Sequence, residues 1–383
     1  MSNQLDIFEP IPDHDYDIEE SQKYLTTQLI TYLGNKRSLL NFIGLGIALV
    51  QEKLNKKKLS TFDVFSGSGV VSRYMKQFSY VLYANDLELY SYVTNSCYLT
   101  NNDQFDHLTY EIYWHKLQRI IHDQGLKEGL IRSLYSPIDE NNITANDRVF
   151  YTVRNAMYID TVRSFIEEIP ETMKKYFLAP LIAEASVHSN TSGVFKGFYK
   201  DANTGIGKYG GTQENALTRI LGDIELKRPV FSNFRCDCVC FKEDANTLVP
   251  RIDEVDLAYI DPPYNQHPYG SNYFMLNLIV DYKEPQELSK VSGIPKNWNK
   301  SLYNQKQSSY VAFKQLVEDI RAKYVLISFN SEGFISLDSM RELLMSIGKL
   351  TVLETKYNTF RGCRNLHNRE KHVKEYLYLL EKI

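Results

Sequence analysis

The stretch Thr61-Phe62-Asp63-Val64-Phe65-Ser66-Gly67-Ser68-Gly69-Val70-Val71 decides the fold. It begins as an apolar run typical of a buried strand, passes through a glycine-rich turn, and continues as a helical pattern up to Gln77. Glycine lets a backbone approach a ligand where a Cβ atom would clash. A strand, a glycine-rich turn and a helix in this order therefore predict the first unit of a nucleotide-binding α/β sheet.

The next predicted strand, residues 80–85, ends at Asp86. An acid at the end of the second strand commonly accepts hydrogen bonds from ribose hydroxyls, and the spacing from Gly67 to Asp86 fits that geometry. The turn lacks the third glycine of a Gly-x-Gly-x-x-Gly pattern, because Ser72 stands there, and it is not a Gly-x-x-x-x-Gly-Lys loop. These departures favour a cofactor without phosphate over one with a pyrophosphate.

A second informative stretch, Asp261-Pro262-Pro263-Tyr264, directly follows the apolar run 255–260. Ligands of open α/β sheets collect at the carboxyl ends of the strands, which is where these residues fall. Proline has no N–H and cannot continue a helix, so its carbonyl is left as a free acceptor. Asp261 adds an anionic acceptor and Tyr264 a flat stacking face. The stretch therefore predicts a clamp for a planar group that carries an exocyclic amine.

The overall composition narrows the class of protein. A length of 383 residues allows two domains, and a net charge of −3 gives no global signal for nucleic-acid binding, so any such signal must be local. We expect no secretory signal and no membrane span. The odd number of cysteines, five, is typical of reduced thiols in a cytoplasm. The series Cys236, Cys238 and Cys240 indicates a strand rather than a metal site, since no second ligand pair accompanies it.

Local signals for DNA binding occur in two segments. Helical patterns from Asn95 to Val187 lead into a loop, residues 188–213, that is rich in Gly, Asn and Ser, and long loops in compact enzymes are usually functional. Its candidates for contact with phosphates and bases are Asn190, Ser192, Lys196, Tyr199, Lys200 and Lys208. A basic turn between two alternating runs near the end of the sequence adds Arg361, Arg364 and Arg369. A flexible surface loop and a solubilising hairpin remain the alternatives.

The beginning of the sequence predicts two further features. Residues 1–20 hold seven acids and no Lys or Arg, which indicates a loose acidic tail that we extend to residue 28. The stretch from Tyr32 to Lys36 precedes a helical pattern, so a helix should start near Lys36. The free N–H groups there could receive a carboxylate, with Lys36 adding charge and Tyr32 a stacking face. An ordinary glycine turn before an amphipathic helix is the alternative.

Together these motifs resemble the adenine-N6 DNA methyltransferases, in the order of the Dam-like subgroup. The matching elements are Tyr32-x-Gly34-x-Lys36, Asp63-x-Phe65-x-Gly67-x-Gly69, Asp86 and Asp261-Pro262-Pro263-Tyr264. The resemblance implies an α/β fold with a Rossmann-like, mostly parallel seven-stranded sheet, helices on both faces and an inserted, mainly helical DNA-recognition domain. The expected units are the acidic tail 1–28, a catalytic domain of residues 29–90 and 235–383, and a target-recognition insert of residues 91–234.

The resemblance also implies the cofactor, S-adenosylmethionine, and a role for each site residue. Tyr32 and Lys36 would lie at its methionine end, above the turn formed by Phe65, Ser66 and Gly67. Asp86 would take the ribose hydroxyls, and Asp244 and Ala245 would face the adenine. Ala245 stands where Dam-like enzymes often have Phe, so another side chain could supply the stacking. Asp261 would border the cofactor and, with the Pro262 carbonyl, accept the hydrogens of an adenine amine, while Pro263 keeps the clamp rigid and Tyr264 stacks on a base flipped out of the duplex.

Several alternatives remain open from the sequence. Cytosine-N4 methylation is one, although its clamp more often begins with Ser, and RNA or glutamine methylation is another. A non-catalytic DNA-binding module that keeps the cofactor site is a third. We expect double-stranded DNA as partner, no metal, no membrane, and a cytoplasmic, nucleoid-associated protein encoded by a bacterium or a phage. A cognate restriction endonuclease or an orphan role, and a monomer or a dimer, are equally compatible with the sequence.

Overall fold

The computed structural model describes residues 19–211, 214, 216–263, 266–330, 333–358 and 372–382. Tyr264, Arg361, Arg364 and Arg369 lie outside the described residues, as does the tail up to residue 18. Predictions that involve those residues therefore stay predictions.

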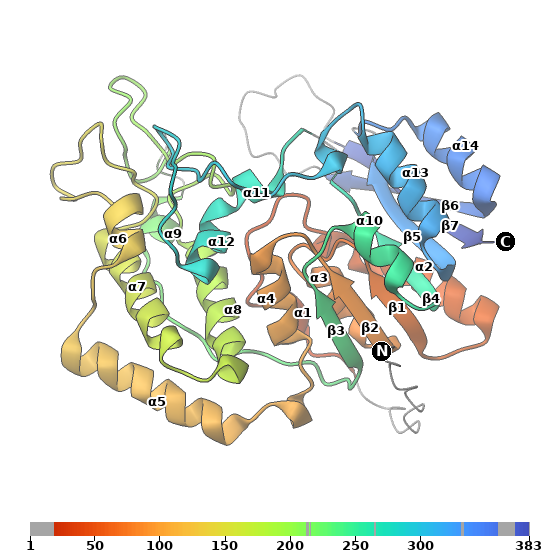
Figure 1. The fold of residues 1–383 in the computed structure, drawn as a ribbon, viewed down its shortest axis with the longest axis horizontal. Coiled ribbons are helices and arrows are strands. Elements are labelled where there is room, and N and C mark those ends of the chain that lie inside the picture. The colour runs from red at the N-terminus through yellow and green to blue at the C-terminus, as the bar shows by residue number, and fades with distance from the viewer. Residues whose placement is uncertain are drawn as a thin grey trace.

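The sheet has seven strands in the order β3-β2-β1-β4-β5-β7-β6 (Figure 1). Strands β1 to β5 are parallel, and β7 runs antiparallel between β5 and β6. This confirms the mostly parallel seven-stranded sheet that the sequence predicts. The bounds are β1 Leu59–Asp63, β2 Ser79–Asn85, β3 Asp237–Phe241, β4 Val255–Ile260, β5 Ala322–Asn330, β6 Gly348–Asn358 and β7 His372–Lys382.

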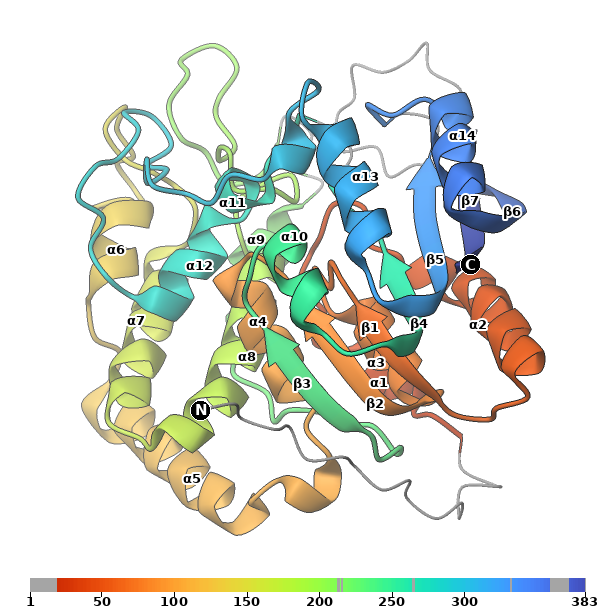
Figure 2. The same ribbon diagram turned by 45° about the vertical axis from the view of Figure 1, so that its right-hand side comes forward.

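Helices cover both faces of this sheet because the strands alternate their apolar side chains between two cores (Figures 1 and 2). On β4, Ala258 and Ile260 pack with α10 (Ala245–Leu248), α13 (Ser309–Asp319) and α14 (Leu337–Ile347). Leu257 and Tyr259 point to the other face, against α2 (Leu40–Leu54) and α3 (Val70–Lys76). Short 3-10 turns precede or follow these elements: η1 Arg37–Leu39, η3 Val249–Arg251 and η4 Leu302–Asn304.

A second, mainly helical part lies beside the sheet (Figure 1). Its core also includes residues 273–280, which follow the clamp in the sequence, and Tyr24, Leu25 and Ile30, which precede the sheet. The predicted boundaries at residues 91 and 234 therefore do not coincide with the packing, and residue 91 falls inside α4. The helices are α4 Leu89–Tyr98, η2 Asn102–Gln104, α5 His107–Gln124, α6 Leu130–Tyr135, α7 Val153–Glu167, α8 Glu171–Val187, α9 Leu217–Leu221, α11 Tyr269–Asn272 and α12 Phe274–Asp281.

The described end of the predicted acidic tail is packed rather than loose. Helix α1 (Gln22–Thr26) buries Tyr24 completely. The buried Arg73 guanidinium donates to the carbonyls of Tyr24 and Thr27 at 2.9 Å and to that of Gln28 at 3.0 Å. The predicted end of the tail at residue 28 is thus too late. The prediction rested on the acidic composition of residues 1–20, which does not indicate whether the apolar side chains after them are buried.

No described helix combines the length and the apolar character that crossing a bilayer requires.

Candidate active site

A pocket with about 870 Å³ of empty space, part of it open to solvent, lies at the carboxyl ends of β1, β2 and β4. It unites segments that are far apart in the sequence, and every residue predicted to bind the cofactor lines it. These residues are Tyr32, Lys36, Phe65, Ser66, Gly67, Asp86, Asp244, Ala245 and Asp261. Pro263 also lines the pocket, whereas Pro262 is buried beside it.

The turn after β1 is held by the acid that ends β2. Gly67 has φ +50°, a conformation that favours glycine, and its N–H donates to Asp86 Oδ2 at 2.8 Å. A Cβ atom at Gly67 would lie 3.0 Å from the Tyr32 ring. The Glu88 N–H donates to the other Asp86 oxygen at 2.9 Å. Asp86 therefore shapes the turn in addition to lining the pocket.

A second acid, Glu88, lies in the same pocket and was not among the predicted site residues. Its Oε2 accepts hydrogen bonds from the side-chain amides of Asn277 at 2.6 Å and Asn299 at 3.2 Å. Burial raises the pKa of Glu88 to about 7, although the Asn277 hydrogen bond lowers it. Burial also raises the pKa of Asp86. The spacing of Asp86 and Glu88, two residues apart after a strand, is a signal that could have identified the second acid.

Tyr32 and Tyr269 line the pocket, and their rings stack in a near-parallel cluster with the buried Tyr273. The Tyr32 ring lies 4.9 Å from that of Tyr269, at 16°, and 4.8 Å from that of Tyr273, at 19°. The Tyr273 hydroxyl accepts the Leu33 N–H at 2.6 Å, and the Tyr269 hydroxyl donates to the Leu33 carbonyl at 3.1 Å. Tyr32 is therefore fixed by residues that follow the clamp by only a few positions.

The end of the pocket near Ala245 is aromatic. The rings of Phe65 and Tyr303 meet edge to face, with centroids 5.1 Å apart and 78° between the planes. The Tyr303 hydroxyl donates to Asn246 Oδ1 at 2.7 Å. Tyr303 was not among the predicted site residues, because it stands in the polar segment 281–309, where no periodic pattern marks a single aromatic residue.

Asp261 lies beside two further charges. The Lys36 ammonium is 3.3 Å from Asp261 Oδ1 and 2.6 Å from Glu375 Oε1. Burial raises the pKa of Asp261 to about 6, while the Lys36 ammonium lowers it and the Glu375 carboxylate raises it. Lys36 immediately precedes η1 and α2, which confirms the predicted start of a helix there.

The predicted DNA-contacting loop runs from the end of α8 toward α9. Ser192, Lys196 and Lys200 are exposed, and Tyr199 and Lys208 are half-buried. Asn190 needs a correction, because it is fully buried. Its amide group donates to the carbonyls of Val149 and Lys208 and accepts the Gly210 N–H. Asn190 therefore holds the loop together instead of facing a duplex.

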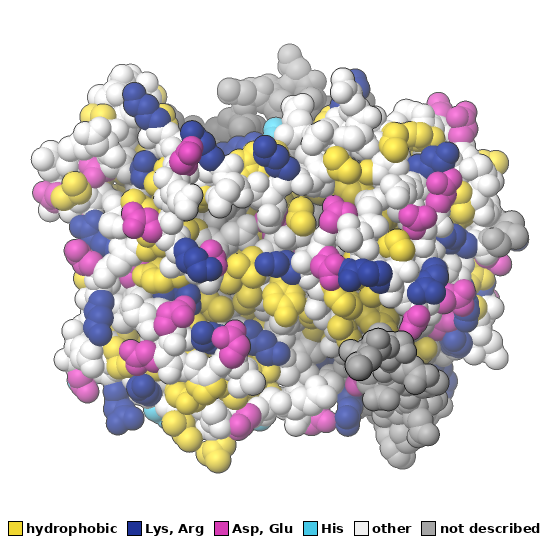
Figure 3. Space-filling model, in the orientation of Figure 1, with side chains coloured by type: hydrophobic (Ala, Val, Ile, Leu, Met, Phe, Trp, Pro, Cys, Tyr) yellow, Lys and Arg dark blue, Asp and Glu magenta, His cyan; other side chains and the backbone are white. Residues whose placement is uncertain are grey.

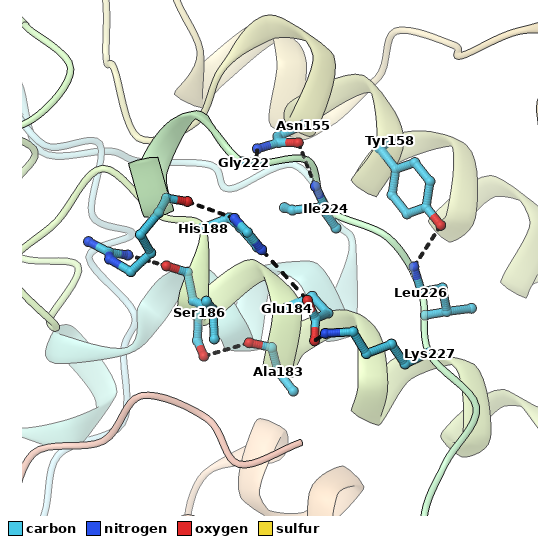
Figure 4. Close-up of polar contacts among 12 residues, drawn as sticks. Asn155, Tyr158, Ala183, Glu184, Ser186, His188, Gly222, Ile224, Leu226 and Lys227 are labelled. Carbon is cyan, nitrogen blue, oxygen red and sulfur yellow. Dashed lines mark hydrogen bonds and ion pairs between the residues drawn. The ribbon is translucent and has the colours of Figure 1, made fainter. Parts of the chain in front are cut away.

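The base of this loop is bonded to the segment that returns from it (Figure 4). The His188 ring nitrogen Nδ1 lies 2.7 Å from the Arg219 carbonyl, and Lys227 donates to Glu184 at 2.8 Å. Asn155 bonds both the Gly222 carbonyl and the Ile224 N–H. Hydrogen bonds from α7 and α8 thus hold both ends of the loop.

Charged side chains of both signs are mixed on the face in Figure 3, with no single basic patch. Within the described part of the chain, no three His, Cys, Asp or Glu side chains lie close enough together to hold a metal ion. Cys238 and Cys240 pack from β3 against the core on the α2 and α3 side, as the alternating pattern predicts.

The fold and the pocket define a class: an α/β protein in which an Asp-Pro-Pro sequence follows β4 at a pocket that lies at the carboxyl ends of the parallel strands. A family model described as D12 class N6 adenine-specific DNA methyltransferase matches residues 32–343, and the chain belongs to this family of enzymes. This confirms the resemblance and favours adenine-N6 over cytosine-N4 as the methylated group. DNA is accordingly the substrate.

Individual relatives agree with the family. The chain is 29% identical to the type II methyltransferase M.NlaIII of Neisseria lactamica over 361 residues, which cover 92% of this chain and 99% of that protein. It is 30% identical to the type II methyltransferase M.CviAII of Paramecium bursaria Chlorella virus 1, over 92% and 98% of the two chains. It is 29% identical to the modification methylase StsI of Streptococcus sanguinis, but spans only 52% of that protein.

Proposed function

We propose that this chain binds S-adenosylmethionine in the pocket between Tyr32, Asp86 and Ala245, and methylates N6 of an adenine flipped out of double-stranded DNA. The observation that supports this most strongly is the position of Asp261. Its carboxylate follows β4 and lines the same pocket as the predicted cofactor residues. One site can therefore present a methyl donor to an amine held by the clamp.

The residues present fit the proposed cofactor. Asp86 and Glu88 offer carboxylates to ribose hydroxyls, and Phe65 and Tyr303 offer the aromatic surface that Ala245 does not. Gly67 leaves room for close approach of the backbone. When bound, S-adenosylmethionine supplies an electrophilic methyl group on a cationic sulfur. Tyr32 and the segment before η1 would border its methionine end.

The chemistry assigned to the clamp follows from the target. An adenine amine is a weak nucleophile because its lone pair is delocalised into the ring. The Asp261 carboxylate and the Pro262 carbonyl would each accept a hydrogen bond from one N–H of the amine, which localises the lone pair on the nitrogen. Positioning and electrostatics then supply most of the rate increase. The base must leave the duplex to reach the clamp, and we propose that Tyr264 stacks on it.

Labelled methyl transfer to unmethylated duplex DNA tests this proposal. The native chain should transfer methyl groups, and Asp261→Asn should lower the rate by a factor of at least about 100, because an amide cannot replace the anionic acceptor. Thermal unfolding and cofactor titration of the same variant should stay near native. Retention of native turnover by Asp261→Asn would contradict the clamp.

We further propose that the enzyme acts in the cytoplasm as the modification partner of a restriction endonuclease. The type II names of M.NlaIII and M.CviAII support this context. DNA from cells that express the chain should carry N6-methyladenine in one short sequence and resist an endonuclease that cuts there. Scattered methylation without a common sequence would contradict this role. The proposed contacts to the duplex remain Ser192, Lys196, Tyr199, Lys200, Lys208 and the arginines of the basic turn.

A further inference from the structure

Glu375 is a buried carboxylate that the proposed chemistry does not use. It lies on β7 with 2% of its surface exposed. Its Oε1 accepts hydrogen bonds from Lys36 Nζ at 2.6 Å and from Ser328 Oγ at 2.9 Å. Burial of a charge is unfavourable unless the charge is paired, so the placement of Glu375 requires these partners.

The position of Glu375 follows from the pairing of the strands. Tyr376 and Tyr378 on β7 point into the core under α13 and α14, while Leu377 and Leu379 point toward α2. Glu375 therefore shares the α2 face of the sheet. The segment that begins α2 carries Lys36, and Asp261 continues β4 on this side. Three elements remote in sequence thus bring their charges to one point.

The Lys36 ammonium is shared unequally between two carboxylates. It is 2.6 Å from Glu375 Oε1 but 3.3 Å from Asp261 Oδ1. A lysine ammonium is a compact charge on a flexible stem, so its position depends on the groups that bind it. Without the charge of Glu375, the ammonium would lose its shorter ion pair and shift toward Asp261. A closer contact with Asp261 would occupy the acceptor that the clamp presents to the amine.

We propose that Glu375 is a positioning residue of the methyl-transfer site, which draws the Lys36 ammonium away from Asp261 and leaves the Asp261 carboxylate available as a strong acceptor. This inference rests on the proposed role of Asp261. The electrostatics of the site agree with it, because the Lys36 ammonium lowers the pKa of Asp261 and the Glu375 carboxylate raises it.

The other groups around Asp261 belong to adjacent strands. Burial is the main cause of the raised pKa of Asp63 on β1 and of Tyr259 on β4, and the negative charge of Asp261 raises both further. The positive charge of Lys36 in turn lowers the pKa of Tyr259. Removal of the Glu375 charge and removal of the Lys36 charge are predicted to shift the pKa of Asp261 in opposite directions, since Glu375 raises that pKa and Lys36 lowers it.

The test compares the pH dependence of kcat in Glu375→Gln and Lys36→Met, with unmethylated duplex DNA and saturating cofactor. Glu375→Gln should lower kcat by roughly tenfold to a hundredfold, as expected for a misplaced catalytic group. It should also move the acidic limb of the pH profile, the fall of kcat as Asp261 becomes protonated, to lower pH. Lys36→Met should move that limb to higher pH. The matched control is Glu381→Gln on the same strand, where Glu381 pairs with Lys53 at the surface at 3.4 Å, and it should change neither quantity.

A purely structural role predicts a different result. If Glu375→Gln lowers the unfolding temperature but keeps both native kcat and the native limb, the proposal is wrong. If that variant does not fold, Ser328→Ala serves instead, because it removes one hydrogen-bond donor to Glu375. Glu375 then binds Lys36 more strongly, so the acidic limb should shift by a smaller amount and in the opposite direction, to higher pH. An unchanged limb in Ser328→Ala would overturn the proposal in that case. An active Asp261→Asn variant would instead refute the proposed role of Asp261, independently of Glu375.

Discussion

At the scale of single residues, Asp261 links the electrostatics of the site to its pH dependence. Burial raises the pKa of Asp261 to about 6. Since the ionised carboxylate is a stronger hydrogen-bond acceptor for the amine than the neutral acid, we predict that kcat/KM falls about tenfold per unit below about pH 6 and is level above it until other groups titrate. Initial rates between about pH 5 and 8 at constant ionic strength measure this. A rate that stays constant through pH 6 would show that protonation of Asp261 does not limit transfer.

Protonation of Asp63 makes the stability of the fold depend on pH. It is fully buried on β1, where Ser72 donates to one oxygen at 2.5 Å, and burial raises the pKa of Asp63 to about 7. Because this pKa is raised, the folded protein binds the proton of Asp63 more tightly than the unfolded chain does between about pH 4 and 7. The stabilisation that comes from this bound proton is lost as the pH rises through the pKa of Asp63 in the folded protein. The charged form is therefore destabilising above about pH 7.

We predict that Asp63→Asn raises the free energy of unfolding at about pH 8, by at most about 4 kcal/mol, since one pKa unit corresponds to about 1.4 kcal/mol. At about pH 5 the gain should be smaller. Urea unfolding at both pH values measures the difference, and the exposed Asp253→Asn is the control. An equal change at both pH values would contradict the linkage.

At the scale of elements, the segment with η4 closes the pocket over Phe65. Tyr303 is 3% exposed and its ring packs against the edge of Phe65. We predict that Tyr303→Ala raises the KM for the cofactor by about tenfold, because an aromatic contact and its buried area are lost, while kcat changes less. Tyr303→Phe keeps the ring and should stay near native. Steady-state kinetics with varied cofactor distinguish the two, and an equal effect of both variants would point to the hydroxyl instead.

The loop after α8 depends on one arginine. Arg219 donates to the carbonyls of Val187, Ser189 and Thr191, the last two at 2.9 and 3.0 Å. We predict that Arg219→Ala weakens DNA binding by about tenfold, because the loop that carries the proposed DNA contacts loses the hydrogen bonds that hold it in place. Cofactor affinity should be retained. Fluorescence anisotropy with duplex DNA and a separate cofactor titration measure both. A loss of cofactor binding would mean that the loop supports the pocket as well.

The elements that the sequence predicts well are those with a local signal. The turn at Gly67, the helix after Lys36 and the strands β2 and β4 follow from periodicity and glycine, which act over a few residues. Asn190 and Glu375 show what is missed, because polar residues in a loop or a strand give no sign of burial. Their partners lie elsewhere in the chain, so only the tertiary pairing reveals that they are structural or positioning groups.

At the scale of the whole molecule, the core of the helical part extends beyond the predicted boundaries at residues 91 and 234. The helical core contains Tyr273 to Val280 and also Tyr24 and Leu25. We predict that a fragment of residues 91–234 unfolds without a cooperative transition, because this apolar surface is missing from its core. Thermal unfolding followed by near-ultraviolet circular dichroism tests this against the full chain. A sharp transition in the fragment would show that it folds independently.

The place of β7 in the sheet has a consequence for synthesis on the ribosome. β6 is made before β7, yet it reaches the sheet only through β7, which pairs with β5 on its other side. A nascent chain that has not yet released β7 lacks both this strand and Glu375, so β5 is an open edge and Lys36 lacks the shorter of its two described ion pairs. Methylation would therefore begin only once β7 has left the ribosome, and a ribosome-bound intermediate should not modify DNA.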